Sequence, residues 1–73
     1  MAARALELEI LRGSRHEATF DAHIDPDDTA ALRQFLADWL TSNKWAPAKW
    51  GKFSLAVRHA GEYKVRKTIR AGG

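Results

Sequence analysis

The sequence predicts a small α+β fold in which two strands, one helix and two further strands follow in that order. Apolar residues alternate with polar ones near the start of the chain, recur at helical spacing from residue 32 to 40, and alternate again from residue 53. A period of two indicates half-buried strands, and a period of 3.6 indicates an amphipathic helix. Residues 1–73 are short enough to form a single domain around one core.

The first two strands are predicted to form a hairpin across a turn from Arg12 to Arg15, which contains Gly13 and Ser14. The inward side chains of this hairpin are Leu6, Leu8, Ile10, Ala18, Phe20, Ala22 and Ile24. The outward side chains of its second strand are Glu17, Thr19, Asp21 and His23. The strict alternation specifies which face each residue occupies.

A helix is predicted to begin at Asp25, whose side chain accepts hydrogen bonds from free backbone amides, with Pro26 at the first helical position. Asp27 and Asp28 oppose the positive end of the helix dipole. A single apolar stripe follows, made of Leu32, Phe35, Leu36, Trp39 and Leu40. Asn43 is a candidate for a left-handed helix stop.

The second hairpin follows a crossover loop from Lys44 to Gly51. Its third strand has Phe53, Leu55 and Val57 inward, and the chain turns between His59 and Glu62. The inward residues of the fourth strand are Tyr63, Val65 and Ile69, and the outward ones are Lys64, Arg66, Thr68 and Arg70. Lys67 is the one charged residue among the inward-pointing positions of this strand. This indicates a position near an edge of the sheet, where the aliphatic part of the side chain packs and the ammonium reaches water.

The connection rules predict how these elements are arranged. A right-handed crossover would place the first and last strands side by side and parallel in the middle of a mixed four-stranded sheet, with the helix across one face. This β-β-α-β-β arrangement is the β-grasp.

The charge distribution is uneven. Twelve Lys and Arg against nine Asp and Glu give a net charge of +3, and from Lys44 to Arg70 the one acid is Glu62. No stretch of the sequence approaches the roughly 20 apolar residues of a membrane span, and no signal peptide is recognisable. A cytoplasmic protein without membrane partners is expected.

Catalytic and metal sites are not indicated. The chain has no cysteine, and no serine has a His and a carboxylate at recognisable spacing, so we expect no enzyme and no cofactor. His16 and His23 have opposite parity on one strand, which argues against a shared metal with His59. Helix capping explains the acidic cluster from Asp25 to Asp28 without a cation.

Three tryptophans occur with Lys44, Lys49 and Lys52, a combination that could stack and bind single-stranded nucleic acid. A core role is favoured, because the net charge is modest. Trp39 is on the helix stripe and is expected to be buried, whereas Trp45 and Trp50 are expected to cover the open end of the sheet.

At this level the chain resembles the ubiquitin-like family over nearly its whole length. The resemblance rests on the two hairpins, the helix start Asp25-Pro26-Asp27-Asp28-Thr29, and the ending Arg70-Ala71-Gly72-Gly73. Two glycines at a chain end have a chance probability of about 0.5% at an average usage of roughly 7% each. The composition, rich in arginine and alanine, suits a bacterial member of this family.

The resemblance implies a protein modifier. Residues 70–73 would form a flexible tail in which Gly73 carries the carboxylate that an activating enzyme adenylates, and Gly72 keeps the tail thin because glycine lacks a Cβ. The implied partners are an adenylating enzyme, a conjugating enzyme, a processing peptidase and a target protein whose amine is modified. The implied docking residues are Lys64, Arg66, Thr68 and Arg70.

Two other functions remain open at this stage. Ala71 before the glycines is also similar to sulfur-carrier relatives, in which the same carboxylate becomes a thiocarboxylate. The crossover is short and rich in tryptophan and the last strand is cationic, which departs from ubiquitin itself. The second alternative is therefore a non-covalent binding module that recognises protein or nucleic acid through its basic second hairpin.

Overall fold

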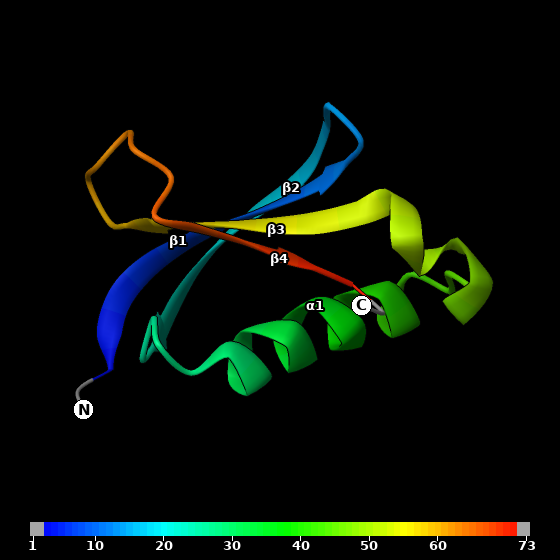
Figure 1. The fold of residues 1–73 in the computed structure, drawn as a ribbon, viewed down its shortest axis with the longest axis horizontal. Helices are drawn as coiled ribbons and strands as arrows, with labels where there is room; N and C mark the ends of the chain where they lie inside the picture. Colours follow the sequence, from blue (N-terminus) through cyan, green and yellow to red (C-terminus); the bar gives the residue numbers. More distant parts are fainter. Residues whose placement is uncertain (1–2, 72–73) are drawn as a thin grey trace.

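The computed structural model describes residues 3–71 and has one four-stranded sheet with a helix on one face, as Figure 1 shows. The elements are β1 (Arg4–Arg12), β2 (Arg15–Ile24), α1 (Thr29–Ser42), a short 3-10 helix (Pro47–Lys52), β3 (Phe53–His59) and β4 (Lys67–Arg70). The predicted α+β class and the order β-β-α-β-β are confirmed.

The arrangement of the strands differs from the predicted one. The sheet has the order β2-β1-β3-β4, and each neighbouring pair is antiparallel. The prediction of a mixed sheet with the first and last strands adjacent and parallel was therefore wrong. β3 lies inside the sheet because it pairs with both β1 and β4. Its Val57 is buried in the core, and Ala56 on the other face is only 3% exposed between the neighbouring strands. β4, with its polar side chains, lies at the edge.

The core lies between the sheet and α1. Its buried residues are Leu6, Leu8, Ile10, Leu32, Leu36, Leu40, Phe53, Leu55, Val57, Ile69 and Ala71. Phe35 and Trp39 are half-buried at the side of the helix stripe, so the expectation that Trp39 is buried holds only in part. The opposite face of the sheet is bare in Figure 1.

In the part of the chain that is described, no helix combines the length and the apolar character that a bilayer crossing requires.

The ends of α1 differ in detail from those predicted. The helix begins at Thr29 with Asp28 as its N-cap, whose side chain accepts from the Ala31 amide, so Pro26 lies before the helix. Asp25 instead accepts from the Asp27 amide and organises the preceding turn. At the other end Asn43 keeps a negative φ, and Lys44 takes the left-handed conformation with φ 62°.

The fourth strand is shorter than predicted. Tyr63 and Val65 have the inward parity, yet they lie in the connection between β3 and β4 and are 101% and 41% exposed. This connection projects beyond the sheet, away from α1, in Figure 1. An alternating pattern gives side-chain parity but does not show whether a second layer is there to cover it.

A bulge in β2 changes the face of one predicted outward residue. Ile10 pairs with Ala18 and Leu11 with His16, so Glu17 is the extra residue between them. Its carboxylate lies 3.1 Å from the Arg12 guanidinium, which stacks over the ring of Trp45 on the core side. Glu17 therefore does not share the face of Thr19, Asp21 and His23.

Candidate docking surface

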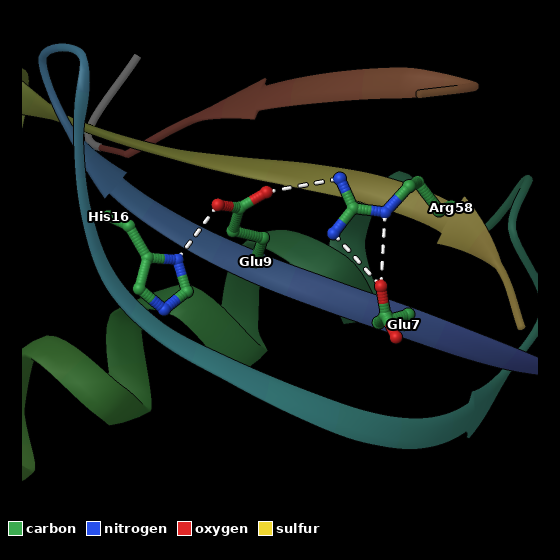
Figure 2. A network of polar contacts seen from close by, with 4 residues as sticks. All are labelled: Glu7, Glu9, His16 and Arg58. Atoms are coloured by element: carbon green, nitrogen blue, oxygen red, sulfur yellow. Dashed lines mark hydrogen bonds and ion pairs between the residues drawn. The ribbon is translucent and has the colours of Figure 1, made fainter. Parts of the chain in front are cut away.

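The bare face of the sheet carries a polar network that joins three strands, shown in Figure 2. Arg58 on β3 donates to Glu7 at 2.9 and 3.1 Å and to Glu9 at 3.0 Å, both on β1. Glu9 also contacts His16 Nδ1 on β2 at 2.8 Å. These side chains alternate with the buried core positions, so the network covers the sheet where no helix lies.

The network shifts the ionisation of its members. Hydrogen bonding to His16 is the largest influence on Glu9 and, with the Arg58 contact, holds the pKa of that carboxyl below its usual value against the opposing effect of burial. The hydrogen bonds that Arg58 donates to Glu7 and Glu9 raise the pKa of its guanidinium above its already high value. The Arg58 side chain is only 16% exposed, and its guanidinium is paired with two carboxylates.

Two cations of the second hairpin are therefore engaged inside the fold. Arg58 is occupied by Glu7 and Glu9. The Lys67 ammonium donates to the Pro26 carbonyl at 3.0 Å and lies 3.4 Å from Thr29 Oγ1, so it fastens the start of α1 to β4 instead of extending into water as expected. The edge position predicted for Lys67 is confirmed.

The predicted docking residues Lys64, Arg66, Thr68 and Arg70 are all exposed. Thr68 and Arg70 pair with Ala56 and Ser54 of β3 and share the bare face. Arg66 makes an ion pair of 3.1 Å with Glu62, and both side chains are about half exposed. The structure thus brings Thr68 and Arg70 onto one strand and leaves Lys64 and Arg66 in the connection before it.

The backbone of β4 offers free groups at the sheet edge. Residues along an antiparallel strand alternate in the side to which their N–H and C=O point. The Ala71 amide donates to the Phe53 carbonyl, so Ala71, Ile69 and Lys67 are directed toward β3. The backbone groups of Thr68 and Arg70 are therefore directed outward, next to the exposed cationic side chains.

Tyr63 is a surface residue that the sequence pattern assigned to the interior. Its ring is 101% exposed, in a connection where residues 60 to 66 are all exposed. Gly61, with φ 85°, lies in the turn that follows β3 and is the one sequence signal that the chain leaves the sheet before Tyr63. An exposed tyrosine beside Lys64 adds a flat apolar contact to the cationic edge.

The net charge of the protein is concentrated in this region. Residues 60 to 71 contain four of the twelve cations and one of the nine carboxylates. The other eight cations and eight carboxylates cancel, so the whole net charge of +3 comes from this segment. The cationic edge is defined here as Lys64, Arg66, Thr68 and Arg70, with Tyr63 beside it.

The predicted conjugation residues Gly72 and Gly73 lie outside the described residues. The prediction that residues 70–73 form a flexible tail is wrong for Arg70, which is the last residue of β4, and for Ala71, which is buried. Ala71 is 5% exposed, and its amide donates to the Phe53 carbonyl at 3.4 Å. The ladder with β3 therefore continues to Ala71.

The other tryptophans pack as a lid over the end of the core, as predicted. The ring of Trp45 meets Phe53 edge-on with centroids 5.0 Å apart, and Trp50 Nε1 donates to the Trp45 carbonyl at 2.9 Å. Neither ring is available as a free stacking platform. Among residues 3–71, no group of three or more His, Asp or Glu side chains is placed to hold a metal.

Comparison with protein-family models, with curated proteins and with solved structures gave no match.

Proposed function

We propose that this chain is a non-covalent binding module that takes up an extended acidic protein segment along the cationic edge. The observation that carries the proposal is the concentration of the entire net charge in residues 60 to 71, on and beside an edge strand. Outward backbone groups at Thr68 and Arg70 give an added strand its hydrogen bonds, and the side chains of Lys64, Arg66 and Arg70 supply charge complementarity.

A peptide fits this edge better than a nucleic acid does. Trp45 and Trp50 are used in the lid, so Tyr63 is the one aromatic ring on the cationic edge. Single-strand binders combine several stacked aromatic rings with a groove of cations.

Conjugation through Gly73, with sulfur transfer as its relative, remains a prediction of the sequence. If Gly73 carries the reacting carboxylate, it is two residues away from buried Ala71, and two residues span at most about 7 Å. A longer reach would require β4 to separate from β3, which would uncover Ile69. The binding proposal needs no such step.

The test is fluorescence anisotropy with a short labelled peptide of alternating Glu and Thr, titrated at several salt concentrations. We expect the triple variant Lys64→Glu, Arg66→Glu, Arg70→Glu to weaken binding at least about tenfold, because it reverses the charge that the peptide meets. The matched control is Lys44→Glu, Lys49→Glu, Lys52→Glu, which changes the net charge equally on exposed residues at a different site. This control is expected to retain most of the binding.

If both triple variants lost the same affinity for the peptide, net charge alone would explain the binding, and the proposal would be overturned. A labelled single-stranded oligonucleotide is titrated in parallel. If the oligonucleotide bound more tightly than the peptide, and Tyr63→Ala abolished that binding, the ligand of the cationic edge would be a nucleic acid and not a peptide.

A further inference from the structure

The other edge of the sheet is long, and from Ala18 to Ile24 it has no proline, lysine or bulge, which are common protections of an edge strand against pairing. Within residues 3–71, β2 pairs with β1 alone and has its other side free. β2 has ten residues and contains neither proline nor lysine, and its bulge at Glu17 leaves Ala18–Ile24 as regular strand. Exposed edges of this length template pairing with another strand unless they are blocked.

An apolar groove runs beside this free edge. It is lined by Phe20 on β2 and by Phe35, Asp38, Trp39 and Ser42 on α1. Phe20 is 36% exposed and meets Phe35 edge-to-face with centroids 5.6 Å apart. α1 packs chiefly over β3 and β4, which leaves the core side of β2 only partly covered.

The direction of the free backbone groups follows from the ladder. The Ala60 amide donates to the Ala5 carbonyl, so the alternate β1 residues from Ala5 point toward β3. Leu6, Leu8 and Ile10 then point toward β2, where their partners are Ala22, Phe20 and Ala18. The backbone groups directed to the free edge of β2 are those of Thr19, Asp21 and His23.

We propose that a second copy of this chain pairs with the first, β2 to β2, in an antiparallel two-fold dimer with a continuous eight-stranded sheet. The two-fold axis passes through Ala22. Asp21 then lies opposite the partner's His23, and the two-fold symmetry gives a second, identical pair between His23 and the partner's Asp21. This pair is complementary whether the imidazole is neutral and donates a hydrogen bond or is charged.

Neighbouring registers match less well. Pairing centred on Asp21 places two carboxylates directly opposite each other, which is destabilising. Pairing centred on Phe20 places His23 opposite the partner's Glu17, which is the bulge residue where the strand ladder is irregular. A shift by one residue would turn the apolar side chains to the wrong face.

The apolar contacts agree with the Ala22 register. Phe20 lies opposite the partner's Ile24, on the same side of the sheet as the groove. Phe20 and its symmetry mate are thereby removed from water, together with the groove walls formed by Phe35 and Trp39. A closed two-fold contact also leaves no second β2 edge free for further growth.

The test uses cysteine, which the natural sequence lacks. Ala22 is a hydrogen-bonded partner of β1, so across the dimer axis the two Ala22 residues form a non-hydrogen-bonded pair with Cα atoms about 4.5 Å apart. This separation suits a disulfide. Ala22→Cys is therefore expected to give a covalent dimer on mild oxidation, at least about tenfold faster than Ala18→Cys on the same face of β2.

Sedimentation of the unmodified chain is expected to show a rise from monomer to dimer mass with concentration. Asp21→Pro removes an outward amide and should abolish the dimer, whereas Thr68→Pro removes an outward amide of β4 and should not. A monomer at all concentrations with equal crosslinking of the two cysteine variants would overturn the proposal. Faster crosslinking of Phe20→Cys would refute the register, and loss of assembly in Thr68→Pro would refute the choice of edge.

Discussion

The two edges of the sheet differ in length, charge and attachment. β2 has ten residues, contacts mainly β1, and has an apolar groove beside it. β4 has four residues, and its Lys67 is tied to the loop before α1. β4 and the connection before it carry the cations that give the protein its net charge. Strand length and inward charge are two ways in which proteins control edge pairing, so β4 is suited to a charged partner and β2 to a copy of itself.

The difference also shows how each edge is held. The network of Arg58, Glu7, Glu9 and His16 links β3, β1 and β2 on the bare face, as seen in Figure 2. β4 has no part in that network and depends on Ile69, Ala71 and the Lys67 contact. Substitutions can therefore loosen one edge without the other.

The largest effect is expected from proline at the bonded positions of β2. Ala22→Pro removes an amide directed toward β1 and should lower the free energy of unfolding by about 3 kcal/mol. Asp21→Pro removes an outward amide and should cost less than about 1 kcal/mol. Urea denaturation at low protein concentration measures both. Equal costs would show that the assigned direction of the β2 amides is wrong.

Loss of Arg58 is expected to come next. Arg58→Ala leaves Glu7 and Glu9 without their cation and should cost about 2 kcal/mol, as for hydrogen bonds to charged groups. Amide hydrogen exchange should quicken in β2 and β1 more than in β4. A uniform increase over all four strands would contradict the separate attachment of the two edges.

Acid should affect the β2 side through Glu9. Because the pKa of Glu9 is held below its usual value of 4.5 in the fold, its contribution to stability is present above about pH 4.5. That contribution is lost as the pH falls through the lowered value. Urea titrations across this range should show a steeper loss of stability in the wild type than in Glu9→Gln. Parallel curves would exclude Glu9 as a source of the acid sensitivity.

On the β4 side, Lys67→Met keeps the apolar stem and removes the ammonium that donates to the Pro26 carbonyl. We expect a cost of about 1 kcal/mol and faster hydrogen exchange at the start of α1. Lys67→Arg is the control that retains a donor. No change in exchange near Thr29 would mean that the contact does not fasten the helix.

The smallest effect is expected from deletion of Gly72 and Gly73. Stability and binding of the acidic peptide should stay within about 0.5 kcal/mol of the full sequence, since neither property depends on these residues in the proposal. The comparison uses thermal unfolding and the same anisotropy assay. A marked loss of peptide binding after the deletion would show that the binding site includes the glycine pair and is not the cationic edge alone.

The sequence by itself determined the element types and the faces of most side chains. The alternation in Leu6, Leu8 and Ile10, and the helical spacing of Leu32, Leu36 and Leu40, correspond to buried positions. The exposure of Thr68 and Arg70 was also predictable, because parity and charge are local properties of a strand.

The tertiary structure alone decided which strands are neighbours and which cations are free. β3 pairs with both β1 and β4 and so lies in the interior of the sheet, and β4 lies at the edge. Arg58 and Lys67 were engaged by groups 51 and 41 residues away, and Tyr63 was left outside because no layer covers it. Periodicity reports the face of a side chain, whereas burial and pairing depend on what the rest of the chain places against that face.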